Sequence, residues 1–373
     1  MTDASKKVAG SPSRGKSTSV PTKDLIYVLL YDTRYMLDYK ANHPEKYPDT
    51  MVDYVADSVQ INEEIKNIVL EHPKLDPQKV RFYTDPYLLM ADLVKDHVRV
   101  KGILNFCDDF TDRVELWSIP SVFEIYKLPF SGYAAKGLLL SHNKFHSYSI
   151  AKQMGVPVPK SYYVMQDTVD DLHVEAFPVL VKPNNEGGSE GISFKSLAHD
   201  EAELQDILSE MLKSFKELIV CDYLPGNELT IGIMRHEDEV IPLTLKILQF
   251  VNFGEDPAIY TCDYKWDETL LGDKQLVVKP FDGDPAIKEQ VVSDSVKLFK
   301  VFECKDFARI DWKCDEYGQP KFLDFNENPM FGIDSSFLYC LEHAGYTRRD
   351  LFNVIIDNLL LATRRPLARP SGL

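Results

Sequence analysis

The chain has 373 residues, 44% of them apolar and 27% charged, which is ordinary for a globular protein and excludes a mostly disordered or collagen-like chain. At roughly 100–200 residues per domain the length predicts two or three domains, and no apolar run approaches the ~20 residues of a membrane-spanning helix. A membrane is therefore not an expected partner, and because the net charge of −16 repels phosphate backbones, nucleic acid is not one either. An anionic small molecule needs a local cationic site or a metal.

The first predicted elements form a layer of alternating strands and helices. Residues 1–23 are rich in Ser, Thr and Lys, which predicts a disordered tail, and their lack of an apolar signal core predicts a cytoplasmic protein. Leu25–Tyr31 is a continuous apolar run, typical of a strand buried on both faces. Apolar residues at helical spacing follow over 52–68, and Val80–Tyr83 and Gly102–Phe106 are further predicted strands. This alternation predicts a parallel αβ layer.

In the rest of the chain, predicted strands and helices alternate less regularly. Asp200 and Glu203 resemble a capping box that begins an amphipathic helix. Proline follows Asp284 at the first position of another predicted helix, which extends to about Phe302. The other predicted elements are a helix at Asn143–Met154, strands at Phe177–Pro183, Leu218–Leu224, Glu228–Met234, Phe307–Lys313 and Lys321–Asn326, and a last helix at Arg349–Thr363.

Six scattered cysteines form no CxxC pair. They are interpreted as free thiols in a reducing compartment, with a disulfide framework or a zinc site as the alternative. They are Cys107, Cys221, Cys262, Cys304, Cys314 and Cys340.

A glycine-rich segment, Lys182–Gly191, leaves a predicted strand. Its glycines let the backbone approach a ligand closely, its N–H groups can form an anion nest, and Lys182 supplies a positive charge. The alternative is a flexible surface hairpin. It is not a Walker loop, because the lysine precedes the glycines.

Two predicted strands carry polar residues at alternate positions. Arg309 and Asp311 share one face of the first strand, and Asp324 and Asn326 share one face of the second. If the strands are neighbours, two carboxylates, an amide oxygen and an arginine converge, a set suited to Mg²⁺ and substrate phosphates. The alternative is an edge hairpin with a solvated polar face.

Two weaker signals complete the set. The strand that ends in Leu224 enters a Pro-Gly turn, where its backbone could pair with an adenine edge, and Glu228 could accept from ribose hydroxyls. Alone, this segment is as well explained by a plain strand–turn–strand. Lys144 and Lys265 lie near the ends of predicted elements, and a lone lysine is usually a surface residue.

The order and spacing of these features resemble the ATP-grasp superfamily and, within it, the D-alanine–D-alanine ligase family. The resemblance covers about residues 100–360 and is strongest at Phe177–Gly191, Leu218–Thr230 and Phe307–Ser336. It implies a three-lobed α/β ATP-grasp fold with a central lobe at 131–220 and a C-terminal lobe at 221–365, after an N-terminal layer at 24–130 and before a tail at 366–373.

The resemblance implies roles at matching positions. For ATP these are Lys144, Lys182, Glu186, Gly187, Gly188, Gly191, Cys221, Asp222, Tyr223, Leu224 and Glu228. For Mg²⁺, or Mn²⁺ in its place, they are Asp311, Asp324 and Asn326, and for the chemistry Arg309, Ser189 and Lys265. The implied reaction is ATP-dependent joining of a small carboxylate and a small amine through an acyl phosphate, and relatives imply a homodimer.

The substrate side departs from the family. The first strand leads into Leu30–Tyr35 without the family's glycines, Gly188 replaces a serine although Ser189 follows, and Met330 replaces a glycine. Trp266 and Asn105–Asp109 also differ from the family pattern. A different substrate pair is therefore expected, with Asp32 and Ser335 as substrate-side candidates. The alternatives are an ATP-grasp kinase, which Arg309 disfavours, and a non-catalytic nucleotide-binding module, which the complete metal set disfavours.

Overall fold

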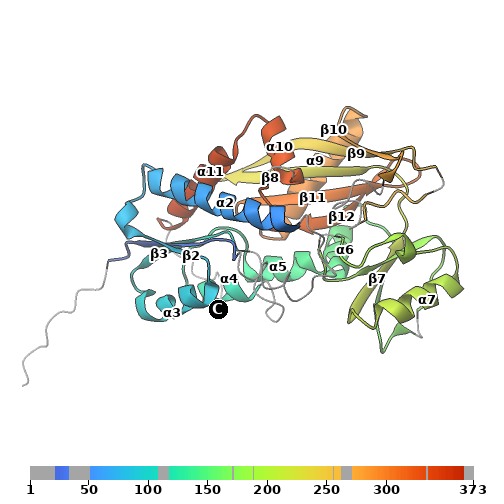
Figure 1. The fold of residues 1–373 in the computed structure, drawn as a ribbon, viewed down its shortest axis with the longest axis horizontal. Helices are drawn as coiled ribbons and strands as arrows, with labels where there is room; N and C mark the ends of the chain where they lie inside the picture. The colour runs from blue at the N-terminus through green and yellow to red at the C-terminus, as the bar shows by residue number, and fades with distance from the viewer. Residues whose placement is uncertain are drawn as a thin grey trace, which may run out of the picture.

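The described strands of the computed structural model form three separate sheets (Figure 1). The first and smallest is at the N-terminus, a four-stranded sheet follows in the middle of the chain, and a five-stranded sheet contains most of the C-terminal part. The structure describes residues 22–32, 51–107, 117–169, 172–187, 189–254, 256–261, 271–332 and 335–364.

The N-terminal sheet is parallel, as the sequence predicts. Its order is β2-β1-β3, and both neighbours run parallel to the central strand. The strands are β1 (Leu25–Leu29), β2 (Val80–Tyr83) and β3 (Val100–Asn105), and the connecting helices are α2 (Met51–Glu71) and α3 (Pro86–Asp96).

The central strand β1 is buried on both faces because its residues alternate between two cores. Ile26 and Val28 join a core formed with α2 and with α11 (Arg348–Ala362). Leu25 and Tyr27 join a second core with α3 and α4 (Ser118–Ile125). The continuous apolar run in the sequence therefore reflects two helix layers on one sheet.

The four-stranded sheet is antiparallel in the order β4-β7-β5-β6. Its strands are β4 (Ser161–Met165), β5 (Val179–Pro183), β6 (Leu197–Ala198) and β7 (Glu217–Asp222). Helix α7 (Glu201–Met211) packs on one face. Asp200 caps this helix as predicted, but the reciprocal bond to Glu203 is donated by the N–H of His199, so the capping box is incomplete.

The five-stranded sheet has the order β10-β9-β8-β11-β12. Its antiparallel strands are β8 (Glu228–His236), β9 (Glu239–Val251), β10 (Gln275–Pro280), β11 (Phe307–Cys314) and β12 (Pro320–Asn326). One face is apolar and lies under α9 (Pro285–Val301), which places Trp312 in the core. Helix α10 (Ser336–His343) packs on part of the other face.

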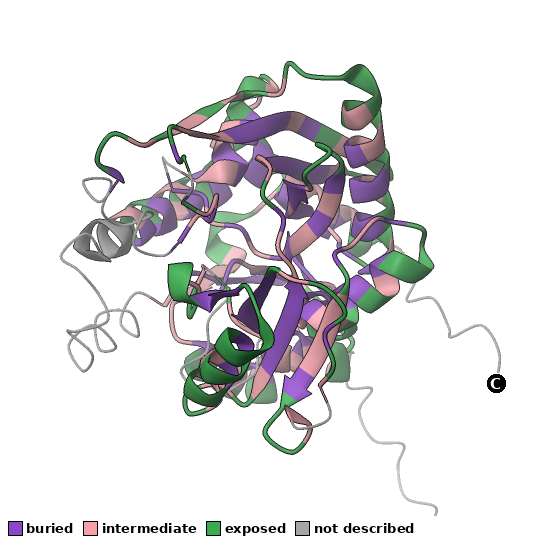
Figure 2. Ribbon diagram, turned by 90° about the vertical axis from the view of Figure 1, so that its right-hand side faces the viewer, coloured by how far each residue is buried: buried purple, intermediate pink, exposed green. Residues whose placement is uncertain are grey.

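Two short helices, α5 (Ala135–His142) and α6 (Lys144–Gln153), lie between the sheets (Figure 1). The sheet strands are largely buried, whereas the outer side of α7 is exposed (Figure 2). The side chain of Asn143 caps α6, and Gly155, with φ of +75°, follows its end. The predicted helices at 143–154, 285–302 and 349–363 are thus confirmed to within a residue or two.

Five of the cysteines are free and buried, which agrees with reduced thiols; Cys262 and most of the predicted tail lie outside the described residues. Within the described ranges, no helix has the length and apolarity needed to cross a membrane.

One partly buried cation, Lys305, joins the N-terminal part to the rest of the chain. The Lys305 ammonium lies 3.0 Å from the centre of the Phe130 ring, and burial lowers its pKa to about 8 against the pull of Asp306 and Glu124. Between pH 8 and the unfolded value of 10.5 the unfolded chain holds more protons, so the free energy of unfolding should rise with pH. Lys305→Met should remove this rise in urea titrations at several pH values, whereas substitution of the exposed Lys300 should leave it in place.

Candidate active site

The site lies on the face of the five-stranded sheet opposite α9. The strand register places Lys246, Thr230, Asp311 and Asp324 in one row across β9, β8, β11 and β12. Directly opposed residues of antiparallel strands point to the same face, so these four side chains share it. The next pair, Arg309 and Asn326, and on the other side Glu228 and Lys313, extend the polar face. The predicted convergence of two carboxylates, an amide and an arginine is confirmed.

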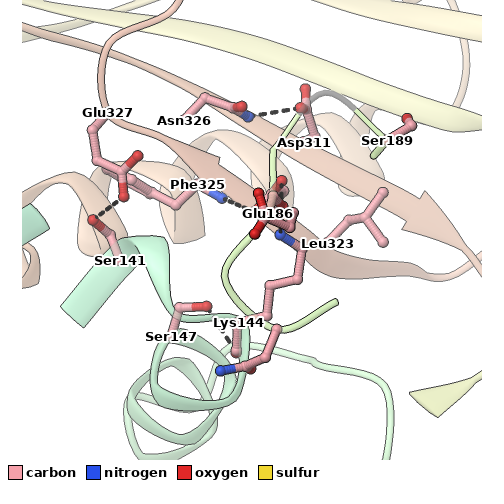
Figure 3. A network of polar contacts seen from close by, with 12 residues as sticks. Ser141, Lys144, Ser147, Glu186, Ser189, Asp311, Leu323, Phe325, Asn326 and Glu327 are labelled. Atoms are coloured by element: carbon pink, nitrogen blue, oxygen red, sulfur yellow. Dashed lines mark hydrogen bonds and ion pairs between the residues drawn. The ribbon is translucent and has the colours of Figure 1, made fainter. Parts of the chain in front are cut away.

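Asp311 is the centre of this polar face. Its Oδ2 accepts from the Asn326 amide at 2.8 Å (Figure 3). The same Oδ2 accepts from the Arg309 guanidinium at 3.0 Å, and Oδ1 accepts from Thr230 at 2.9 Å. Burial alone would raise the pKa of the Asp311 carboxyl, but the Arg309 charge and these hydrogen bonds lower it below its usual value. Asp311 is therefore an anion held in one orientation, not the solvated edge residue of the alternative interpretation.

Asp324 connects this face to the first phosphate-binding candidate. Its carboxylate lies 3.7 Å from the Lys144 ammonium, which also donates to the carbonyl of Glu186 at 2.6 Å (Figure 3). Lys144 is 5% exposed and begins α6. The usual expectation for a lone lysine is therefore wrong here: α6 holds Lys144 between the glycine-rich segment and β12.

Lys182 is buried without a compensating charge. It lies on β5, where Val179 and Val181 face α7 and the alternating residues, Leu180 and Lys182, face away from it. It is 5% exposed, and among the described residues no carboxylate lies within ion-pair distance. A buried ammonium of this kind is costly unless an anion pairs with it.

The segment between Lys182 and the glycines is braced from two sides. Asn184 accepts from the backbone N–H of Phe145 at 3.0 Å and donates to the Glu217 carboxylate, to which Asn185 also donates. The N–H of Lys144 donates to the carbonyl of Asn184 at 3.0 Å. These bonds fix the two candidate phosphate lysines relative to one another.

The glycine-rich segment is partly described: Glu186, Gly187, Ser189 and Gly191 have positions, and Gly188 lies outside the described residues. The hydroxyl of Ser189 donates to the carbonyl of Tyr260 at 3.1 Å, which connects the segment to the loop after β9. Ser189 has φ of +67° and Gly191 φ of +69°, so the turn uses the left-handed region twice.

Gly191 should not tolerate a side chain. A Cβ there would lie 2.7 Å from Pro183 Cγ and 2.9 Å from the Phe215 ring, in a left-handed conformation that costs a non-glycine residue roughly 1–2 kcal/mol. Gly191→Ala should displace the turn and raise the KM for ATP several-fold in an ADP-release assay. Gly187→Ala is the matched control, because a Cβ there meets open space; equal effects of the two changes would contradict the prediction.

The segment from Cys221 to Leu224, predicted to pair with an adenine edge, has both apolar and polar neighbours. Cys221 is buried against Leu180, Leu224 is buried, and the Tyr223 hydroxyl accepts from the N–H of Ala258 at 2.7 Å. The Asp222 carboxylate accepts from the N–H of Lys160, a contact between strands. Glu228, the predicted ribose acceptor, pairs with the buried Lys313 ammonium at 3.2 Å.

The remaining positions singled out in the sequence lie outside the polar face or outside the described residues. Lys265 and Trp266 lie outside the described residues. Ser335 caps α10, where its hydroxyl accepts from the N–H of Leu338 at 3.1 Å. Asp32 follows the end of β1.

Sequence reasoning missed four polar residues of the site: Thr230, Lys246, Lys313 and Asn184. The two lysines could have been noticed, since each interrupts an apolar strand, Lys246 between Leu245 and Ile247 and Lys313 after Trp312. A cation inside a buried strand points to a charged partner. The site therefore gathers several buried lysines in a chain that is acidic overall. Such a local cluster of cations is what an anionic ligand requires.

The donor set fits Mg²⁺. Asp311 and Asp324 oppose each other directly, and Asn326 donates its amide N–H to Asp311, so its amide oxygen remains an acceptor. Among the described residues no cluster of three or more His, Cys, Asp or Glu could hold a metal, so a set of two carboxylates and one amide is the candidate. When bound, Mg²⁺ would neutralise phosphate charge there.

The chain is similar to known ligases over most of its length. Residues 150–357 match the family model for the D-ala D-ala ligase C-terminus. The uncharacterized protein y4sG of Sinorhizobium fredii is 27% identical over 68% of this chain and 73% of its own length. D-alanine–D-alanine ligase B of Clostridium perfringens is 26% identical over 65% of this chain and 76% of its own length.

Solved structures agree on the fold. The D-alanine–D-alanine ligase of Bacillus anthracis complexed with ATP superposes with a TM-score of 0.62 at 17% identity, over 91% of this chain and 99% of that one. The VanG D-Ala:D-Ser ligase of Enterococcus faecalis gives a TM-score of 0.61 at 16% identity, over 92% of this chain and 99% of that one. The family model spans more than half of the chain. The chain therefore belongs to the D-ala D-ala ligase C-terminal family and has the ATP-grasp fold.

Proposed function

We propose that this protein is an ATP-dependent, ADP-forming carboxylate–amine ligase that acts on a substrate pair other than two D-alanines. The observation that carries the proposal is the polar face around Asp311, where Arg309, Asn326 and Thr230 fix a carboxylate directly opposite Asp324. Buried Lys144 lies 3.7 Å from Asp324, and Lys182 is buried on β5, two cations of the kind that the binding of a triphosphate would require. The ATP bound to the B. anthracis relative supports the choice of nucleotide.

In the proposed reaction a substrate carboxylate oxygen attacks the γ-phosphorus of ATP, and ADP leaves. The amine of the second substrate then attacks the acyl carbon, loses one proton, and displaces inorganic phosphate, which leaves an amide. Lys144 and Lys182 hold phosphate oxygens, and Arg309 offsets charge on the transferred phosphoryl group. Asp311, Asp324 and Asn326 would hold Mg²⁺, and Glu228 and the segment from Cys221 to Leu224 would contact the ribose and base.

Substrate-side sequence supports a different pair. Met330 stands where the resemblance expects a glycine whose backbone supports the acyl oxygen, and the segment after β1 lacks the expected glycines. A homodimer stays a prediction of the resemblance, and a cytoplasmic location stays a prediction of the sequence.

One incubation tests the proposal. Purified protein, MgATP and pooled amino acids and small carboxylates are analysed by mass spectrometry. ADP together with a mass equal to acid plus amine minus water supports the ligase. ADP with a stable phosphorylated substrate supports a kinase instead, and ligation of D-alanine to itself as the main product would contradict the different pair.

The double variant Asp324→Ala, Asn326→Ala is the matched control, because it removes two of the three proposed Mg²⁺ ligands and leaves Asp311 bound to Arg309. Turnover should fall to background. Full activity of this variant would contradict the assigned metal site, whereas a nucleotide-binding module would show no turnover in either form.

A further inference from the structure

The loop over residues 327–332, here called the β12–α10 loop, borders the polar face. It begins directly after Asn326, a proposed Mg²⁺ ligand, and leads towards α10, which packs on the same face of the five-stranded sheet. Phe331 and Gly332, at its end, are buried. The conformation of this loop therefore sets how Asn326 and the first turn of α10 are placed relative to one another.

Phe331 anchors the loop through its side chain. The ring is fully buried, and its centre lies 5.1 Å from that of Phe307 on β11, 5.9 Å from that of Phe337 on α10 and 5.2 Å from that of Phe352 on α11. These contacts hold the ring but do not fix the orientation of the peptide group that follows it. Among the residues that the structure describes, no backbone N–H donates to the Phe331 carbonyl, and a buried carbonyl needs a donor.

Arg348 supplies that donor and connects the loop to α2. Its Nη1 donates to the carbonyl of Phe331 at 2.9 Å, and its Nη2 lies 3.0 Å from Oε2 of Glu64 on α2. Arg348 is the first residue of α11, whose start is fixed by a capping box of Thr347 and Asp350. A cation at this position meets the positive end of the helix dipole, which disfavours it. The helix therefore gives no reason for an arginine here, whereas the loop carbonyl and Glu64 do.

Helix α2, which lies beside α11 (Figure 1), supports two segments that border the site. Besides Glu64 it carries the buried Asn62, whose side chain accepts from the N–H of Tyr31 at 3.1 Å and donates to the carbonyl of Tyr31 at 3.0 Å. A Cβ at Gly332 would lie 3.2 Å from Oδ2 of Asp57, so the β12–α10 loop passes close to α2 at a second point. One helix thus holds both the chain after β1 and this loop.

We propose that Arg348 is a positioning residue for the amine-transfer step: it holds the β12–α10 loop against α2 and so keeps ATP consumption coupled to amide formation. The proposed phosphate lysines are on other elements, Lys144 on α6 and Lys182 on β5, so the affinity for ATP should not depend on Arg348. The loop instead adjoins the N-terminal sheet, where Asn328 donates to the carbonyl of Phe106 at 3.4 Å. The inference rests on the proposed ligase function and adds a residue that acts through the loop.

A displaced loop would favour a competing reaction with water. In the intended step the amine attacks the acyl carbon of the acyl phosphate, loses one proton and displaces inorganic phosphate. Water that attacks the same carbon loses one proton, displaces phosphate and returns the free carboxylate, so one ATP is consumed without an amide. Misplacement of a reacting group by about 1 Å can cost about 100-fold in rate, and exclusion of water prevents such hydrolysis. A loosened loop should therefore slow amide formation more than ADP release.

The test compares the ADP released with the amide formed from the substrate pair that the pooled incubation identifies. In the wild type the two amounts should be nearly equal. Arg348→Met should lower kcat for the amide by about tenfold to a hundredfold and raise the ratio of ADP to amide several-fold, with the KM for ATP unchanged within about twofold. Arg348→Lys keeps the charge and one donor, so it should restore part of the coupling, and it replaces Arg348→Met if that variant does not fold. A ratio that stays near one in both variants would overturn the proposal.

Arg349→Met is the matched control. Arg349 is the next residue of α11, is 53% exposed and pairs with Glu71 on α2 at 2.9 Å, so it joins the same two helices at the surface. If the bridge between α2 and α11 were all that mattered, the variants of Arg348 and Arg349 would have the same effect. Equal uncoupling by Arg349→Met, or a loss in Arg348→Met confined to the KM for ATP, would therefore overturn the positioning role.

Hydrogen exchange separates this inference from the ligase proposal, because it needs no substrate. Amide exchange in peptides that cover residues 327–332 is followed by mass spectrometry in the free protein. Arg348→Met should accelerate exchange there by about tenfold to a hundredfold, the range that one hydrogen bond to a charged group supplies, whereas Arg349→Met should not. If no substrate pair is found, this difference would still support the positioning of the loop. The same exchange in Arg348→Met and the wild type would overturn it.

Discussion

Lys182→Met should reduce kcat/KM for ATP by roughly 100-fold to 1,000-fold, the range seen when one preorganised donor to a developing charge is removed. The structure buries this ammonium on β5 with no carboxylate in ion-pair range among the described residues, so an anionic ligand is its natural partner. Methionine keeps the length and apolar body of the side chain. The measurement is the ATP dependence of ADP release, together with direct binding of a non-hydrolysable ATP analogue.

The free energy of unfolding separates a ligand-binding role from a structural one. An unbalanced buried charge destabilises the unliganded protein, so Lys182→Met should unfold at an equal or higher urea concentration than the wild type. Lys279→Met should change neither ATP use nor stability. Unchanged ATP affinity in Lys182→Met would contradict the assignment of this lysine to the nucleotide.

Trp312→Ala should lower the free energy of unfolding by about 3–5 kcal/mol, as truncations of large buried aromatic residues do. Trp312 is fully buried and packs edge-on against Phe322, with the two ring centres 6.0 Å apart. Its indole N–H donates to the hydroxyl of Ser295 at 3.0 Å. It follows Asp311 on β11, at a register shift in the pairing with β12. The measurement is urea unfolding followed by circular dichroism.

Two further substitutions test the cause of this loss. Trp312→Phe keeps most of the apolar volume but leaves the buried Ser295 without its donor, so a loss of about 1–3 kcal/mol is expected. Tyr317→Ala is the control, since Tyr317 is 79% exposed on the turn between the same strands. A loss for Tyr317→Ala comparable to that for Trp312→Ala would argue against the buried aromatic as the source.

The features that sequence predicted correctly depend on local periodicity. Alternation along β11 and β12 places Arg309 with Asp311 and Asp324 with Asn326, and the strands need only be neighbours for the groups to meet. The continuous apolar run of β1 likewise predicted a strand between two helix layers. The cap predicted at Asp200 also marks the observed start of α7.

What sequence missed depends on the register between distant segments. Lys246 belongs to the site only because β9 pairs with β8 so that it opposes Thr230, and no local pattern contains that pairing. Lys313 pairs with Glu228 for the same reason. The strands β9 and β10 and the helix α10 were not predicted, although α10 supplies the hydroxyl that Lys246 contacts.

The position of α11 has a consequence for the order of events during synthesis. The N-terminal sheet buries Ile26 and Val28 against residues of this helix, such as Ile355, and Leu359 lies within 3.0 Å of the position a Cβ would take at Gly102. A ribosome releases β1 to β3 long before it has made residues 348–362. Domains usually fold as they emerge, N-terminal ones first, but here one core of the first sheet stays open until the last described helix arrives. A nascent chain arrested before α11 should therefore expose an apolar surface that chaperones bind.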